Sequence, residues 1–297
     1  MKQLVVEFIR PFKSGDTTKQ LIFINVLFFL IVGVGGSILR LFGFPMFEKL
    51  MLSVLAMPSK LPNLAFKPWT LFTHMFLHAQ LFHLLGNVVI MYFAGQLFSS
   101  YLGNKRILTV YILGGLCGAV LFLLAYNTLP FFDSMKESSS ISLGASAATI
   151  SLLVAIATYA PNIEVKLFLV LDVKLKYIAM LLVLVSLLGV DDGNAGGNIS
   201  HIGGAIFGFI YITRIKSNKE FGRFVPTIIS AIAGYFERKP KVVYTDFKNK
   251  VRNDDMYNTL KKTNQAAIDA ILDKISKSGY DSLSKEEKEI LFKASKS

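Results

Sequence analysis

Six apolar segments recur along the chain, and they restrict its fold more than any other feature. The first, Leu21–Leu39, follows a basic stretch and is long enough to cross a bilayer, which takes about 20 residues. In hydrocarbon every backbone N–H and C=O must be bonded internally, so repeated segments of this kind predict helices. The other five are about Leu81–Phe98, Ile107–Tyr126, Ser146–Tyr159, Tyr177–Gly189 and Ile199–Ile215. We therefore predict an all-α polytopic membrane protein, a bundle of six transmembrane helices.

Composition supports this class and argues against a nucleic-acid partner. The 297 residues are 53% hydrophobic and only 18% charged, which is too apolar for an ordinary soluble globule. The formal net charge is +12, but the basic residues flank the apolar segments and gather in the C-terminal third. Membrane orientation explains that pattern more simply than nucleic acid does. Cys117 is the single cysteine, so no intramolecular disulfide can form.

The distribution of charge predicts which side each loop faces. Basic residues mark the arm before Leu21, the loop at Lys105, the loop at Lys166–Lys176 and the region after Arg214, whereas the two loops containing Asp133 and Asp191 are not basic. The positive-inside rule then places both termini in the cytoplasm and the starts of the fourth and sixth helices near the outer face. No targeting pattern is visible, which suits a bacterial inner membrane; a eukaryotic membrane stays open.

The chain outside the bundle divides into three further parts. We expect a basic cytoplasmic arm over 1–19, the six-helix membrane domain over 20–216, a juxtamembrane amphipathic segment over 217–240 and a soluble helical appendage over 241–297. Phe221–Phe236 is short for a span and Pro226 interrupts it, although a seventh span is an alternative. The long connection Arg40–Pro68 is too broken to span and is expected to be interfacial or re-entrant.

The C-terminal appendage carries its own helix signals. Asn264–Ser276 repeats apolar residues at helical spacing, and Gly279 fits the end of that helix. Ser282 or Ser284, ahead of two glutamates, fits the N-cap of a second helix. The sequence therefore predicts a small pair of helices, and it does not show what they bind.

Polar side chains in the apolar helices need a reason, because each costs a few kcal/mol on insertion scales. His83 and Asn87 are four residues apart and share one face of the second helix. His201 begins the sixth helix, just before Gly204 and Gly208, whose spacing allows close helix packing. The partner face could come from Ala147, Ala148 and Ala155. We assign Gly144 to the same close packing.

Ser146, within Gly-Ala-Ser-Ala-Ala, is the candidate nucleophile. A serine hydroxyl attacks only when a base removes its proton, and imidazole is the usual base near neutral pH. No Asp or Glu stands in a predicted membrane helix, so the pattern predicts a dyad of Ser146 and His201. The backbone N–H of Ser146, with the side chains of His83 and Asn87, could stabilise an oxyanion. Ordinary packing or structural hydrogen bonding is the alternative for each of these residues.

His74 and His78 have the spacing of a metal pair. No thiol or carboxylate ligand stands near them in the sequence, so we expect no metal and no other cofactor. A hydrogen bond from His78 to the first connection, or help at the oxyanion site, is the alternative.

Three motifs in order resemble the rhomboid family of intramembrane serine proteases. They are Gly-Ala-Ser-Ala around Ser146, His83-Leu-Leu-Gly-Asn87, and the run from Ser200 to Gly208; the segment from Pro68 to His78 is also similar. The resemblance covers about 17–214. It implies a six-helix bundle that cleaves transmembrane substrates, with the nucleophile on the fourth helix, its base on the sixth, and oxyanion donors matching His83 and Asn87.

The chain departs from that family pattern at two positions beside the serine. Ala147 stands where the family usually has glycine, and Ile150 where an aromatic residue often stacks on the base. A catalytically inactive relative that binds membrane proteins is therefore the first alternative. A small transporter is the second, but no internal repeat supports it. We expect transmembrane proteins and the lipid bilayer as partners.

Overall fold

The computed structural model describes residues 15–135, 140–167, 171–190, 194–236 and 247–294. The chain divides into two compact units, Met1–Phe236 and Glu237–Ser297, and each is described by itself. The predicted arm before residue 15 and the loop with Asp191 lie outside the described residues.

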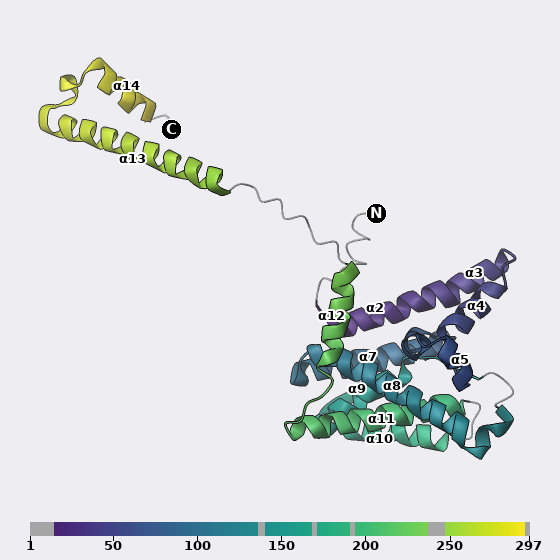
Figure 1. The fold of residues 1–297 in the computed structure, drawn as a ribbon. Coiled ribbons are helices and arrows are strands. Elements are labelled where there is room, and N and C mark those ends of the chain that lie inside the picture. The colour runs from purple at the N-terminus through teal and green to yellow at the C-terminus, as the bar shows by residue number, and fades with distance from the viewer. Residues whose placement is uncertain (1–14, 136–139, 168–170, 191–193, 237–246, 295–297) are drawn as a thin grey trace. The chain divides into compact units, whose positions relative to one another are not determined.

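The first unit is mostly helical. Among the residues that the structure describes, three helices are long and apolar enough to cross a membrane, namely Thr17–Leu41, Leu81–Leu102 and Lys105–Thr128; the shorter Ser146–Tyr159 and Leu175–Leu188 are apolar as well. These helices are α2 (Thr17–Phe29) with η1 (Leu30–Val34) and α3 (Gly35–Leu41), α7 (Leu81–Leu102), α8 (Lys105–Thr128), α9 (Ser146–Tyr159) and α10 (Leu175–Leu188). A further helix, α11 (Ala195–Lys216), follows α10, and Figure 1 labels all of these elements except η1. Each of the six predicted helices is thus present near its predicted position, and η1 is a widened π turn within the first.

Backbone-to-backbone packing at glycines holds the centre of this unit together, where α8, α9 and α11 lie side by side (Figure 1). A Cβ built on Gly203 of α11 would lie 2.8 Å from the Cys117 carbonyl oxygen of α8. A Cβ on Gly204 or Gly208 would overlap the carbonyl oxygen of Ala147 or Ser151 on α9. Three helices can approach this closely only where side chains are missing.

The long connection forms short helices and does not span. It contains α4 (Met46–Leu55), β1 (Met57–Pro58), α5 (Leu61–Phe66), α6 (Thr70–Thr73) and the 3-10 turn η2 (His74–Phe76). Its second half is bonded to the end of α4: the Trp69 indole N–H donates to the Val54 carbonyl at 2.8 Å and the Thr73 hydroxyl to the Leu55 carbonyl at 2.6 Å.

A β-hairpin between α9 and α10 corrects the prediction of a plain loop there. Strand β3 (Glu164–Leu167) pairs antiparallel with β4 (Leu171–Lys174), and Lys166 lies opposite Asp172. Their ion pair is 3.0 Å long, and Glu164 similarly faces Lys174. Opposite charges on facing positions favour this register.

The segment after α11 corrects the prediction that Pro226 interrupts it. Helix α12 runs over Phe224–Phe236, so the proline stands in its first turn, where a missing N–H costs nothing. Before α12, Glu220 accepts from the Arg106 guanidinium at 2.6 and 3.0 Å and from Arg223 at 2.7 Å. The start of α8 is thereby bonded to the chain that follows α11.

The second unit contains α13 (Phe247–Ser278), the turn η4 (Tyr280–Ser282) and α14 (Lys285–Ala294). The predicted start of α13 at Asn264 was too late, because α13 begins at Phe247, before its apolar stripe. Gly279 ends it with φ 78°. Ser284 caps α14 through reciprocal bonds with Glu287, which also pairs with Lys274 at 2.9 Å.

Candidate active site

The loop before α9 is held by backbone bonds to the first connection. Strand β2 (Ile141–Ser142) pairs antiparallel with β1, and the Ser59 N–H donates to the Ser140 carbonyl at 2.9 Å. Next along the loop, the Gly144 N–H donates to the His74 carbonyl at 2.9 Å. These bonds fix the chain immediately before Ser146.

Gly144 itself lies in this loop and does not lie on a packed helix face, contrary to our assignment. Its φ is +125°, a conformation that other residues rarely adopt. A Cβ built there would be 2.8 Å from Cε1 of His83 and 3.7 Å from Oγ of Ser146. The missing side chain therefore leaves space between the His83 ring and the Ser146 hydroxyl.

The structure brings Ser146 and His201 together, although they are 55 positions apart in the sequence. Ser146 is the first residue of α9, and His201 lies in the second turn of α11. His201 Nε2 is 2.7 Å from Ser146 Oγ, and both side chains are half-buried. The glycine contacts of Gly204 and Gly208, on the same face of α11, set the helix separation that makes this bond possible.

The other ring nitrogen of His201, Nδ1, lies close to a residue that the sequence did not single out. His201 Nδ1 is 3.1 Å from Oγ of Ser186, on α10. Ser186 is also within 2.9 Å of the Leu182 carbonyl, one turn back on its own helix. A polar residue in an otherwise apolar helix was the available signal, since such residues need a partner.

His83 and Asn87 lie on α7 beside the serine loop, with His78 as a third member. The Asn87 amide nitrogen donates to the His83 carbonyl at 2.9 Å and lies 3.2 Å from His78 Nε2. The His78 and His83 rings meet edge to face with centroids 5.0 Å apart. Among the described residues, His78 Nδ1 is buried without a hydrogen-bond partner. Of the predicted oxyanion donors, the His83 ring is thus nearest the space left by Gly144.

His74 contributes hydrogen bonds that hold the loop before Ser146. Its Nδ1 is 2.8 Å from the Thr70 carbonyl, while its own carbonyl receives the Gly144 N–H. Within the part of the chain that the structure describes, no group of three or more His, Cys, Asp or Glu side chains could hold a metal ion.

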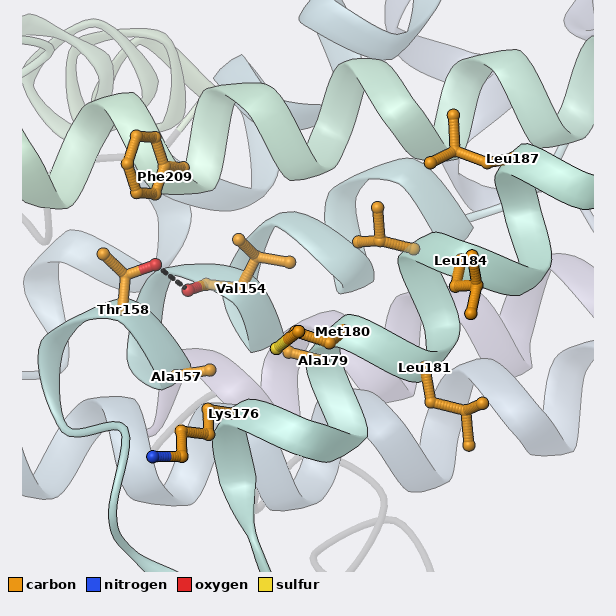
Figure 2. Close-up of a pocket in the computed structure, with 11 residues that line it drawn as sticks. Val154, Ala157, Thr158, Lys176, Ala179, Met180, Leu181, Leu184, Leu187 and Phe209 are labelled. Carbon is orange, nitrogen blue, oxygen red and sulfur yellow. Dashed lines mark hydrogen bonds between the residues drawn. The ribbon is translucent and has the colours of Figure 1, made fainter.

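Apolar grooves border α10 on two sides. Figure 2 shows the first, where Val154 and Thr158 of α9, Met180 and Leu184 of α10 and Phe209 of α11 line a hollow. The Thr158 hydroxyl bonds back to the Val154 carbonyl at 2.7 Å, so it offers the hollow no free donor. The second groove separates α10 from α7; Val89 and Phe93 face Ile178 and Leu182 across it.

Comparison with known proteins gives one family match in each of the two units of the chain. The profile of the Rhomboid domain matches residues 65–218, and that of a family of unknown function (DUF6576) matches residues 253–297. A protein described as RHOMBOID-like protein 7, from Arabidopsis thaliana, is 34% identical over 144 residues. The matched stretch covers 48% of this chain and 41% of that relative's length.

Proposed function

Since the chain belongs to the rhomboid family and is an integral membrane protein, we propose that it is an intramembrane serine endopeptidase. Ser146 is the nucleophile and His201 the general base of a dyad. The substrates are membrane proteins whose transmembrane segments unwind near the outer face.

One observation carries the proposal: His201 Nε2 lies 2.7 Å from Ser146 Oγ. That is hydrogen-bond distance for proton transfer from a hydroxyl to an imidazole. A serine that only filled space on a small-residue face would not need an imidazole on the neighbouring helix. Nucleophile and base within bonding reach are the geometric signature of an activated serine.

The reaction follows from these two groups. Ser146 Oγ attacks the carbonyl carbon of the scissile bond and passes its proton to His201 Nε2. As the C–N bond breaks, the same proton goes to the leaving amine, and an ester to Ser146 remains. Water then attacks that ester, giving its proton to Nε2, and the acid product leaves as the proton returns to Ser146 Oγ.

The space between His83 and Ser146 suits the oxyanion of this reaction. Gly144 leaves it open, and the backbone N–H of Ser146, at the N-terminus of α9, is a donor beside it. His83 contributes its ring N–H, and Asn87 contributes its amide after turning from His78. Loss of one such donor typically costs about 10²–10³ in rate.

The proposed topology has six spans with both termini in the cytoplasm, in a bacterial inner membrane. Glu220 pairs with Arg106 and with Arg223, and these contacts bring basic residues from two different connections together. The positive-inside rule assigns basic connections to the cytoplasmic side. Ser146 begins a 14-residue helix about 21 Å long, shorter than the hydrocarbon core of about 30 Å, so the site is recessed from the outer surface. Residues 241–297 form the cytoplasmic appendage, and reporter fusions after Ser297 and within 136–139 test the two sides.

We place substrate access at α10, where the groove between α7 and α10 leads from the lipid side. A matched test introduces cysteines at Val89 and Leu182, which line opposite walls of that groove, in a Cys117→Ala background. Disulfide formation between them should stop cleavage of a transmembrane substrate, and reduction should restore it. Each single cysteine serves as the control. An oxidised pair that still cleaves at the wild-type rate rules this route out.

The first experiment is labelling of the detergent-solubilised protein by a fluorophosphonate probe. Wild type should label, and Ser146→Ala and His201→Ala should not. Ser200→Ala is the matched control, because Ser200 is a buried serine next to His201 whose hydroxyl donates to the Gly196 carbonyl of its own helix. A folded wild type that does not label is an inactive relative, and the dyad proposal is then wrong.

A further inference from the structure

Ser186 is a buried hydroxyl on α10. The helix is otherwise made of apolar residues after Tyr177, and half of its residues are exposed. Its buried residues are Leu175, Ala179 and Ser186, which lie on one face at helical spacing. The Ser186 side chain is only 4% exposed and therefore points from that face toward α11.

The hydrogen bonds of Ser186 fix the direction of its proton. A serine hydroxyl has one donor and two acceptor positions. The donor is used on the Leu182 carbonyl at 2.9 Å, because a carbonyl can only accept. The oxygen therefore accepts from His201, whose Nδ1 is 3.1 Å away, and Nδ1 must carry the ring proton.

We infer that Ser186 is a positioning residue for the base: it holds His201 in the tautomer whose Nε2 lone pair faces Ser146. The tautomer of a neutral histidine is set by the hydrogen bond that the other ring nitrogen makes. With the proton on Nδ1, Nε2 is free to accept from Ser146 Oγ across 2.7 Å. With the proton on Nε2, the ring would donate to that oxygen and could not act as its base.

This inference rests on the proposed function, and it adds no proton transfer to the proposed reaction. The proton removed from Ser146 goes to Nε2 and from there to the leaving amine. The Nδ1 proton stays on the ring throughout, and Ser186 keeps its own proton on the Leu182 carbonyl. Ser186 thus supplies the acceptor that a carboxylate supplies in a triad, without adding a charge to the membrane.

The test compares three variants in the full-length protein. Ser186→Ala should lower kcat for a transmembrane substrate about tenfold, the effect of one neutral hydrogen bond, with KM little changed. Ser186→Thr keeps a hydroxyl and should restore most of kcat. Ser200→Ala removes a hydroxyl of the same kind and similar burial, also bonded four residues back in its helix, and should leave kcat near wild type.

Nitrogen-15 spectra of histidine-labelled protein give a readout that packing alone would not move. The His201 signal is identified by its loss in His201→Gln. It should report a protonated Nδ1 in wild type and a population protonated at Nε2 in Ser186→Ala. Wild-type kcat in Ser186→Ala, equal losses in Ser186→Ala and Ser200→Ala, or a neutral wild-type ring protonated at Nε2 would each overturn the inference. Absence of fluorophosphonate labelling in wild type defeats the dyad instead, and the tautomer is still measured.

Discussion

A single methyl group on α11 should disable the site without touching it. Gly204 lies one turn from His201 on the same face, and a Cβ there would overlap the Ala147 carbonyl oxygen of α9. Non-bonded carbon and oxygen atoms keep about 3.3 Å or more between them, so Gly204→Ala should push the helices apart by about 1 Å. The 2.7 Å contact between Ser146 and His201 would then exceed hydrogen-bond distance.

The expected loss follows from that displacement. A misplacement of about 1 Å costs a reaction about 10²-fold, and overpacking costs about 1–3 kcal/mol of stability. The fluorophosphonate labelling rate measures the first effect and thermal unfolding in detergent the second. Gly86→Ala is the matched control, because a Cβ on Gly86 of α7 meets nothing within 4 Å. Gly86→Ala should raise the free energy of unfolding by up to about 1 kcal/mol, which is the gain in helix propensity from glycine to alanine.

The two variants should therefore change stability in opposite directions. If Gly204→Ala labels at the wild-type rate and unfolds at the wild-type temperature, close helix packing does not set the distance between Ser146 and His201.

Three smaller changes test other contacts of the fold. The Arg106 guanidinium lowers the pKa of Glu220 from 4.5 to about 2, so the pair stabilises the fold fully above pH 4.5 and progressively less as the pH falls through about 2. Glu220→Gln should cost about 1.5 kcal/mol at pH 7 and flatten the acid dependence of thermal unfolding between those values; an unchanged acid profile contradicts this. Tyr111→Phe removes a fully buried hydroxyl that donates to the Met75 carbonyl and accepts from Asn25, and should lower stability by about 1–3 kcal/mol in the same assay, whereas no loss means that these bonds add nothing. Ser284→Ala breaks the capping box of α14, and hydrogen exchange in its first turn should quicken by the equivalent of about 1 kcal/mol; equal exchange rates would exclude a role for the cap.

The sequence predicts the helices of the membrane unit because their signals are local. Apolar length, basic flanks and helix-end residues identify α7, α8 and α9 within a few residues of their observed ends. The capping residue Ser284 and the terminating Gly279 are equally local. The pairing of β3 with β4 escaped prediction because its charge pairs join positions that only the antiparallel register brings face to face.

The site could be predicted in part. Ser146, His201, His83 and Asn87 stood out as polar residues at apolar helix ends, and the structure places them around one loop. Ser186 could not be assigned a partner, because the rotation of α10 about its own axis decides which face meets His201. That rotation depends on packing between helices, which no spacing within one helix reports.

The contacts of Gly204 and Gly208 also determine how freely this sequence can vary. An ordinary core tolerates drift because a large residue on one side can be exchanged for a smaller one while its neighbour grows. Where α11 meets α9, the partners of the two glycines are main-chain atoms, which no substitution can trim. Variation at this contact is therefore one-directional, since every replacement adds volume and no second mutation can take it away. A single substitution at either glycine can therefore change the distance between Ser146 and His201, and no second substitution at the contact can restore it.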